Sequence, residues 1–324
     1  MIGGGSWATA LVKILTDNNQ PVTWWIRNQS TIDYIKQFSH NPNYLSSVNL
    51  NLELIDLSND LNETLEKCDQ IILAVPAAFL KSTLALAEYK NFEHKIFISA
   101  IKGIVPEDNL IVGEFLHKNY LMPFENLLIL SGPCHAEEVA LEKLSYLTIA
   151  CQDVNKATAF AQTLANRYIK TSVIDDIYGT EYSAVLKNIY AIASGICKGL
   201  GYGDNFQAVL ISNAIQEIKR FVDVVHPISR DIKGSAYLGD LLVTAYSQFS
   251  RNRTFGNMIG KGHSVKSAQL EMNMIAEGYY AVKCMHITNK QYKVEMPICR
   301  AVYAILYENI SAKMEMKLLE DLLC

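Results

Sequence analysis

Two stretches of the sequence place basic side chains where they could take part in chemistry, and the first surrounds Lys187. The segment 181–193 consists mainly of small and apolar residues, and its spacing predicts a helix with a single lysine inside it. A lysine on such a helix either extends its ammonium to the helix edge or has a lowered pKa, which would suit a general acid or base. The residues alone leave both interpretations open.

The second stretch is the polar segment 250–253, Ser-Arg-Asn-Arg. Two guanidinium groups beside a hydroxyl and an amide can bind phosphate through bidentate, charge-assisted hydrogen bonds. A solvated basic loop would have the same composition. The segment therefore predicts either a phosphate pocket or an exposed turn.

A glycine-rich turn opens the chain. Gly3, Gly5 and Ala8 occupy the small-residue positions of the pattern G-x-G-x-x-G/A, in which glycines permit a tight turn and let backbone N–H groups approach a pyrophosphate. The helix expected from Ser6 onward would direct its positive end at the phosphates. A flexible terminal tail is the alternative, but a helix and then a strand at 22–26 follow with the spacing of a β-α-β unit. We therefore predict a dinucleotide site.

The residue that follows this strand bears on the choice of cofactor. An acidic side chain at this place usually binds the ribose of NAD, whereas the sequence here is Ile26-Arg27-Asn28. Arg27 would suit the 2′-phosphate of NADP, and a solvated arginine at a strand end is equally compatible. The cofactor is therefore expected to be NADP or NAD.

The elements that must position these residues change character along the chain. The first half alternates short apolar strands with helical patterns, which is typical of a parallel sheet, and a helix is expected at 31–38. From Tyr178 onward the periodicity is helical nearly to the end. We predict an α/β fold with a Rossmann-type dinucleotide-binding domain at 1–176 and a mainly α-helical substrate and catalytic domain at 177–324. The expected strands are 22–26, 71–75, 96–100, 127–130 and 146–150.

The overall composition argues against several classes of protein. The seven cysteines form no CxxC pair and the seven histidines no HExxH motif, so neither a disulfide framework nor a metal site is expected. A net charge of −4 argues against a nucleic-acid partner, while a local basic cluster could still bind a small anionic substrate. Without an apolar run of about 20 residues or a signal-like start, we expect a cytoplasmic protein with no membrane anchor.

Taken together, these segments resemble one enzyme family. The sequence is similar over essentially its whole length to bacterial NAD(P)-dependent glycerol-3-phosphate dehydrogenases, whose motifs occur here in the family's order. These motifs are Gly3 to Ala10, Val75-Pro76, Ile101-Lys102-Gly103, Ser131-Gly132-Pro133, Val185 to Asn188, Leu238 to Leu241, Ser250 to Arg253, Ala276-Glu277-Gly278 and Glu295 to Ile298.

The resemblance implies reversible reduction of dihydroxyacetone phosphate to sn-glycerol 3-phosphate, for phospholipid synthesis. The partners expected are a small phosphorylated substrate and, as an option that the sequence leaves open, a second copy of the chain in a homodimer. Lys187 is implied as the proton donor and acceptor, with Lys102 and Asp240 beside the reacting carbon. The implied substrate site is Lys102, Gly132, Cys134, Lys187, Asp240, Thr244, Ser250, Arg251 and Asn252; the implied cofactor site is Gly3, Gly5, Ser6, Trp7, Arg27, Lys102, Ala136, Arg251, Ile275 and Glu277.

These residue types fit the chemistry. The reaction needs a hydride at the carbonyl carbon and a proton at its oxygen, and Lys187 would supply the proton. A positive Lys102 nearby would lower the pKa of Lys187 and polarise the carbonyl, whereas Asp240 would oppose that shift, so the sequence does not give its sign. Arg251 and Asn252 would hold the phosphate and position the substrate.

Two departures from the family pattern stand out. Family members commonly have Ser or Thr where this chain has Cys134, and a thiol is a weaker hydrogen-bond donor than a hydroxyl. Only Met1 and Ile2 precede Gly3, so we expect the first strand of the Rossmann domain to be absent and its two neighbours to have unpaired edges. We therefore expect the native polypeptide to begin upstream of Met1.

Other reductases with a catalytic lysine are the nearest competing families. β-Hydroxyacid dehydrogenases and ketopantoate reductases bind a carboxylate. A test of dihydroxyacetone phosphate against 2-keto acids would therefore distinguish them from glycerol-3-phosphate dehydrogenases. A nucleotide-binding regulatory protein without activity is a further alternative. The joint presence of Lys187, Lys102, Asp240 and Arg251 argues against it, because an inactive fold has no need of all four.

Overall fold

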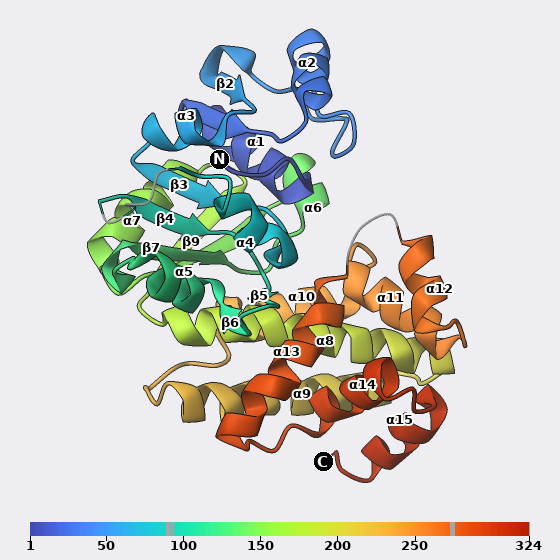
Figure 1. Ribbon diagram of the computed structural model, residues 1–324. Coiled ribbons are helices and arrows are strands. Elements are labelled where there is room, and N and C mark those ends of the chain that lie inside the picture. The colour runs from blue at the N-terminus through green and yellow to red at the C-terminus, as the bar shows by residue number, and fades with distance from the viewer. Residues whose placement is uncertain (89–91, 93, 273–275, 324) are drawn as a thin grey trace. The chain divides into compact units, whose positions relative to one another are not determined.

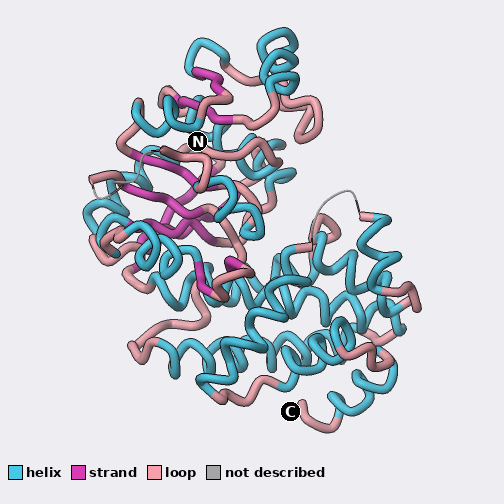
Figure 2. The backbone as a smooth tube through the Cα atoms, viewed as in Figure 1, coloured by secondary structure: helices cyan, strands magenta, loops and turns pink. Residues whose placement is uncertain are grey.

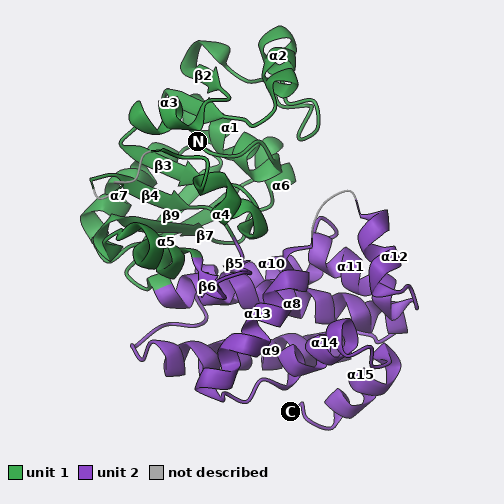
Figure 3. Cartoon of the chain, in the orientation of Figure 1, with its two compact units in different colours: residues 1–101, 112–177 green, residues 102–111, 178–324 purple. Residues whose placement is uncertain are grey.

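The computed structural model describes residues 1–88, 92, 94–272 and 276–323. The chain forms two compact units (Figure 3), the first comprising residues 1–101 and 112–177 and the second residues 102–111 and 178–324. Strands gather in the first unit, whereas helices dominate the second (Figure 2). The segment 102–111, which lies within the predicted first domain, is part of the second unit in the structure.

The segment 102–111 belongs to the second unit because its apolar side chains are buried there. It forms a small antiparallel hairpin in which Ile104 pairs with Ile111, and both side chains lie in the helical core. The hydroxyl of Thr288 donates to the carbonyl of Asn109 at 3.4 Å, which ties the hairpin to a helix of the same unit. The strands are β5 (Ile104–Val105) and β6 (Leu110–Ile111).

The sheet of the first unit carries the strands that the sequence predicts. A five-stranded part has the order β3-β4-β7-β8-β9, with neighbours parallel except β7 and β8, which are antiparallel. A parallel pair, β1 and β2, forms the other part. The five predicted strands are confirmed, and β2 and β9 were not predicted. The strands are β1 (Val22–Trp25), β2 (Ile55–Ser58), β3 (Gln70–Leu73), β4 (Ile96–Ser99), β7 (Leu127–Ser131), β8 (Ser145–Ala150) and β9 (Ile169–Ile174).

Met1 to Gly3 occupy the place between β1 and β3. Ile2 bridges Trp25 on one side and Leu73 on the other, both in parallel orientation. Its N–H donates to Ile72 at 2.8 Å, and the Met1 carbonyl accepts from Trp25 at 2.8 Å. The expectation that these edges stay unpaired is therefore wrong for the residues opposite Met1 to Gly3. The physical reason is that an extended segment between two parallel strands can donate and accept on both sides.

Helices pack around this sheet and complete the first unit (Figure 1). The amphipathic helix α1 buries Leu11 and Ile14, which share a core with Trp24 of β1 and Ile98 of β4. The helix expected at 31–38 is confirmed as α2. The helices are α1 (Ser6–Asp17), α2 (Gln29–Phe38), α3 (Leu61–Glu66), α4 (Ala77–Leu84), α5 (Val112–Tyr120), α6 (Ala136–Ala140) and α7 (Val154–Leu164), with short 3₁₀ turns at Leu52–Leu54 and Phe124–Asn126.

The second unit is built around one long helix, α8, which is buried along most of its length. Val185, Ile189 and Ile192 lie in a single core shared with the surrounding helices. Among the described residues no helix is long and apolar enough to cross a membrane. The helices are α8 (Ile177–Leu200), α9 (Asp204–Val225), α10 (Asp240–Tyr246), α11 (Arg251–Gly260), α12 (Val265–Glu271), α13 (Glu277–Tyr292), α14 (Pro297–Tyr307) and α15 (Ala312–Glu320).

Candidate active site

Three of the predicted site residues meet at one point in the second unit. The Nζ atom of Lys187, on α8, lies 2.5 Å from Oδ1 of Asp240 at the start of α10. The Nζ atom of Lys102 lies 3.2 Å from the other carboxylate oxygen, Oδ2. One carboxylate therefore joins two ammonium groups that come from distant parts of the sequence.

The cluster is shielded from water to different degrees. The side chains of Asp240 and Lys187 are 1% and 5% exposed, whereas that of Lys102 is 18% exposed. Burial by itself raises the pKa of Asp240, but the positive charges of Lys102 and Lys187 outweigh it and leave the pKa below its usual value. Asp240 therefore stays ionised. The ammonium of Lys187 is buried and paired with Asp240.

Neighbouring backbone and amide groups hold the cluster in place. The side-chain amide of Asn188 donates to the carbonyl of Lys102 at 2.7 Å, which fixes the backbone from which the Lys102 side chain extends. A π-helical turn at Ser235–Gly239 leads into Asp240, and such turns are frequent at functional sites. The Thr244 hydroxyl donates to the Asp240 carbonyl at 2.6 Å, one helical turn along α10. This role of Asn188 was not predicted from the sequence.

Helix α11 packs on α8 at unusually short range. A Cβ atom on Gly256 would lie 2.1 Å from the carbonyl oxygen of Ile192, and one on Gly195 would lie 2.1 Å from that of Arg253. Such contacts are sterically impossible, so only glycine permits this approach. The close packing fixes the start of α11 relative to Lys187.

The predicted phosphate segment forms the start of α11. The Ser250 side chain accepts from the N–H of Arg253 at 3.3 Å and caps the helix. Oδ1 of Asn252, a buried residue, accepts from the N–H of Gly278 at 2.9 Å, at the start of α13. Arg251 is the first residue of α11 and is exposed. Residues 250–253 therefore form the N-cap and first turn of α11 and not an irregular loop.

The glycine-rich turn in the first unit has the features of a pyrophosphate site. Gly3 has a φ of +124°, and a Cβ there would lie 2.6 Å from the carbonyl oxygen of Ala74, so the turn requires glycine. A Cβ on Gly5 would meet no atom of the described residues within 4 Å, which leaves open space at the start of α1. Among the described residues, no side chain caps that helix and none forms a hydrogen bond with the buried indole nitrogen of Trp7. The uncapped backbone N–H groups at the start of α1 and the indole N–H of Trp7 are donors that fit the phosphates of a bound dinucleotide.

The remaining predicted cofactor residues are spread over both units. Arg27 is exposed just after β1 and forms no ion pair with the described residues. In the first unit Ala136 begins α6. In the second, Glu277 is the first residue of α13, and Ile275 lies outside the described residues.

Gly132 and Cys134, predicted to contact the substrate, follow β7 in the first unit. Gly132 has a φ of +120°, and a Cβ there would lie 2.5 Å from the carbonyl oxygen of Tyr146. The Cys134 thiol is buried and donates to the Gly132 carbonyl at 3.5 Å. The thiol therefore supports the local turn, which gives the unusual cysteine a structural contact within the unit.

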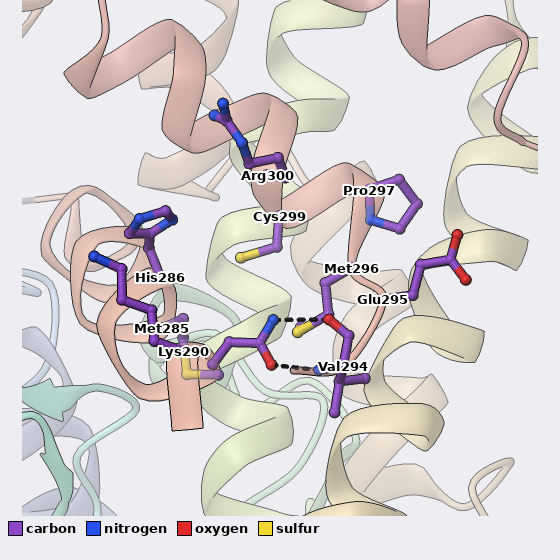
Figure 4. A pocket seen from close by; sticks show the side chains of 10 residues that line it. Met285, His286, Lys290, Val294, Glu295, Met296, Pro297, Cys299 and Arg300 are labelled. Carbon is purple, nitrogen blue, oxygen red and sulfur yellow. Dashed lines mark hydrogen bonds between the residues drawn. The ribbon is translucent and has the colours of Figure 1, made fainter. Parts of the chain in front are cut away.

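A separate cavity lies between the end of α13 and the start of α14 (Figure 4). Its volume is about 370 Å³, and the Asn289 side chain braces one wall through two hydrogen bonds to the backbone of Val294, at 2.8 and 2.9 Å. Among the described residues of its lining, Glu295 to Pro297 come from a motif of the family pattern, but none belongs to the predicted catalytic, substrate or cofactor sites.

Comparison with known proteins identifies the family. The model of the NAD-dependent glycerol-3-phosphate dehydrogenase N-terminus matches residues 1–157, and that of the C-terminus matches residues 176–317. The chain belongs to this family. Glycerol-3-phosphate dehydrogenase [NAD(P)+] of Bacillus velezensis is 34% identical over 99% of this chain and 96% of its own length.

Further glycerol-3-phosphate dehydrogenases agree with this assignment. That of Staphylococcus carnosus is 34% identical over 98% of this chain and 96% of its own length. The crystal structure of the Coxiella burnetii glycerol-3-phosphate dehydrogenase has a TM-score of 0.90 with 28% identity, covering 98% of this chain and 97% of that one. The predicted fold class is therefore confirmed, and the competing reductase families are set aside.

Proposed function

We propose that this protein transfers hydride reversibly between NAD(P)H and dihydroxyacetone phosphate, giving sn-glycerol 3-phosphate. The observation that carries the proposal is the cluster of Lys102, Lys187 and Asp240. Two ammonium groups and one carboxylate leave a single net positive charge in a largely buried place. Such a charge stabilises the negative charge that develops on a carbonyl oxygen during reduction.

Lys187 is the proton donor in this proposal. Its ammonium donates a proton to the carbonyl oxygen as the carbon accepts hydride, and the resulting amine takes the proton back in the reverse reaction. Asp240 stays ionised because two lysines lower its pKa, so it orients the Lys187 ammonium and does not compete for the proton. Lys102, the most exposed of the three, polarises the same oxygen.

The start of α11 supplies the phosphate contacts. Arg251 would bind the phosphate by charge-assisted hydrogen bonds, because this exposed residue lies on the first turn of the helix. The amide nitrogen of Asn252 would add a donor, since its oxygen is engaged by Gly278. Binding energy from the phosphate then positions the carbonyl carbon at the other end of the substrate. Thr244, Gly132 and Cys134 complete the proposed substrate contacts.

The glycine-rich turn is the proposed cofactor site of the first unit. When bound, the nicotinamide cofactor supplies the hydride. Gly5, Ser6 and Trp7 would donate N–H groups to its pyrophosphate, and Arg27 would bind the 2′-phosphate of NADP(H). Gly3 shapes the turn, and Ala136, Ile275 and Glu277 are further proposed contacts.

We also propose a pathway, a cellular location and an assembly for the protein. The product would serve phospholipid synthesis in the cytoplasm, with a homodimer as the proposed assembly and no nucleic-acid partner. The net charge of −4 supports the last point, because nucleic acids bind basic surfaces.

A spectrophotometric assay tests the proposal. Purified protein should oxidise NADPH or NADH when dihydroxyacetone phosphate is added, and should produce glycerol 3-phosphate. Ketopantoate and other 2-oxo acids, which bind through a carboxylate, should give no more than background rates. Turnover of a 2-oxo acid with none of dihydroxyacetone phosphate would refute the proposal.

A further inference from the structure

Asn41 is a fully buried polar residue in the turn that follows α2. Its side-chain nitrogen donates to the carbonyl of Gly4 at 3.1 Å and to the hydroxyl of Thr9 at 3.0 Å. Its side-chain oxygen accepts from the N–H groups of Asn43 at 3.0 Å and Tyr44 at 3.3 Å. An asparagine side chain offers two N–H donors and an oxygen with two lone pairs, and all four are used here.

The partners of Asn41 lie in the glycine-rich turn. Asn41 holds the carbonyl of Gly4, and the Thr9 hydroxyl donates to the carbonyl of Gly5 at 3.0 Å. Because Asn41 also donates to the Thr9 hydroxyl, one small network contacts two successive carbonyl groups of the turn. The carbonyl of Gly5 accepts in addition the helical hydrogen bond from the N–H of Thr9 at 3.0 Å.

The orientation of these carbonyls determines the orientation of the next N–H groups. A trans peptide is planar, so its C=O and N–H point in opposite directions. Holding the carbonyl of Gly4 directs the N–H of Gly5 away from Asn41, and holding that of Gly5 does the same for Ser6. These N–H groups therefore point to the side of the turn opposite the network. A Cβ on Gly5 would also meet no atom of the described residues within 4 Å, so there is open space beside this part of the turn.

We propose that Asn41 is a positioning residue for the pyrophosphate, which presets the N–H groups of Gly5 and Ser6 before the cofactor arrives. The inference rests on the proposed function of the glycine-rich turn. Preset donors bind phosphate more tightly because little ordering is left to occur on binding. Asn41 does not touch the cofactor in this role; it acts through the backbone of the turn.

If Asn41 only stabilised the fold, its substitution would have a different effect on ligand binding. It would affect the stability of the first unit and the affinity for every ligand of that unit alike. Positioning of the N–H groups instead affects ligands that carry the pyrophosphate and spares those that lack it. ADP and adenosine differ in this group, so they serve as probes beside NADPH.

The variant Asn41→Asp keeps the shape of the side chain but sets a carboxylate oxygen against the Gly4 carbonyl. Thr9→Val removes the hydroxyl with little change in volume, and Thr9→Ser retains it. Asn43→Ala is the matched control, because Asn43 lies in the same turn and is exposed. Thermal unfolding of each variant and its KM for dihydroxyacetone phosphate show whether the rest of the protein is intact.

We expect Asn41→Asp to weaken the binding of NADPH and ADP about tenfold or more, which is the effect of a lost charge-assisted hydrogen bond. Adenosine affinity and the KM for dihydroxyacetone phosphate should change less than twofold. Thr9→Val should weaken ADP binding in the same direction, Thr9→Ser should restore it, and Asn43→Ala should resemble the wild type.

Two results would overturn the inference alone: wild-type ADP affinity in folded Asn41→Asp, or equal losses for ADP and adenosine. If Asn41→Asp does not fold, the two Thr9 variants decide on the same terms. Failure of the wild type itself to bind NADPH would instead overturn the proposed function, and this inference with it.

Discussion

The ammonium of Lys187 and the carboxylate of Asp240 form an ion pair of 2.5 Å in which both side chains are at least 95% buried. Removing one partner of such a pair usually leaves an uncompensated buried charge. Here Lys102 lies 3.2 Å from the same carboxylate, so Asp240 keeps a counter-ion when Lys187 is replaced. Substitution of Lys187 therefore tests its chemistry without necessarily unfolding the protein.

Replacing Arg251 by alanine should chiefly weaken binding of the phosphorylated substrate. We expect the KM for dihydroxyacetone phosphate to rise about 30-fold, which corresponds to about 2 kcal/mol for a desolvated guanidinium–phosphate contact. Steady-state kinetics measure the effect. Lys261→Ala, at an exposed position just beyond the other end of α11, is the control. An unchanged KM in Arg251→Ala would refute the phosphate role.

Arg27→Ala should distinguish the two cofactors. We expect the affinity for NADPH to fall about tenfold and that for NADH less than twofold, because only NADPH carries the 2′-phosphate that Arg27 would bind. Fluorescence titration gives both dissociation constants. Lys36→Ala on α2 removes a neighbouring positive charge as a control. Equal losses for both cofactors would show that Arg27 does not recognise the 2′-phosphate.

Gly256→Ala should destabilise the second unit and disturb its substrate site together. The added Cβ would lie 2.1 Å from the carbonyl oxygen of Ile192, so α11 must move away from α8. We expect a loss of about 1 to 3 kcal/mol in the free energy of unfolding and a higher KM for dihydroxyacetone phosphate. Gly203→Ala, where a Cβ would meet no atom of the described part of the chain within 4 Å, should leave both unchanged. A fully stable and active Gly256→Ala would contradict the close packing.

Glu217 should make the stability of the second unit depend on pH. Burial raises its pKa from 4.5 to about 7, although it accepts hydrogen bonds from the N–H groups of Ile298 and Cys299 and from the Tyr190 hydroxyl. Between pH 4.5 and 7 the folded state therefore binds more protons than the unfolded state. The free energy of unfolding should fall by up to about 3 kcal/mol as pH rises through this window.

The measurement is denaturant unfolding from pH 5 to pH 8. Glu217→Gln should remove this component of the slope, because glutamine does not titrate. Glu295→Gln, at an exposed position in the loop before α14, should retain the wild-type slope. A slope that is the same in Glu217→Gln and the wild type would show that Glu217 is not the group responsible.

Much of this architecture could be predicted from the sequence because the relevant signals are local. The apolar strand 127–130 and the long apolar helix around Lys187 depend on periodicity alone. β2 was missed because only two of its residues, Ile55 and Leu57, are apolar, and they are separated by the exposed Asp56. β9 was missed because Lys170 is exposed and most of its other side chains are only partly buried. The pairing of Ile2 with strands on both sides could not be predicted, since two residues carry no periodic pattern.

Some residues of the site could be identified from sequence motifs, whereas others are revealed only by the tertiary fold. Family motifs pointed to Lys102, Lys187 and Asp240, and the structure brings them together. Asn188 and Asn41 were not assigned roles, because their importance comes from the carbonyl groups that they bind, and such partners are set by the tertiary fold. The contact between Asn41 and Gly4, which lie 37 positions apart, has no signal in the sequence.

Turnover of Lys187→Ala tests the central claim most directly. At saturating NADPH and dihydroxyacetone phosphate we expect kcat to fall about 100-fold or more, while the dissociation constant for NADPH stays within twofold of the wild type, because the variant loses proton transfer and no proposed cofactor contact. Lys198→Ala, an exposed lysine on the same helix, should keep the wild-type rate. Wild-type turnover in Lys187→Ala would contradict the account.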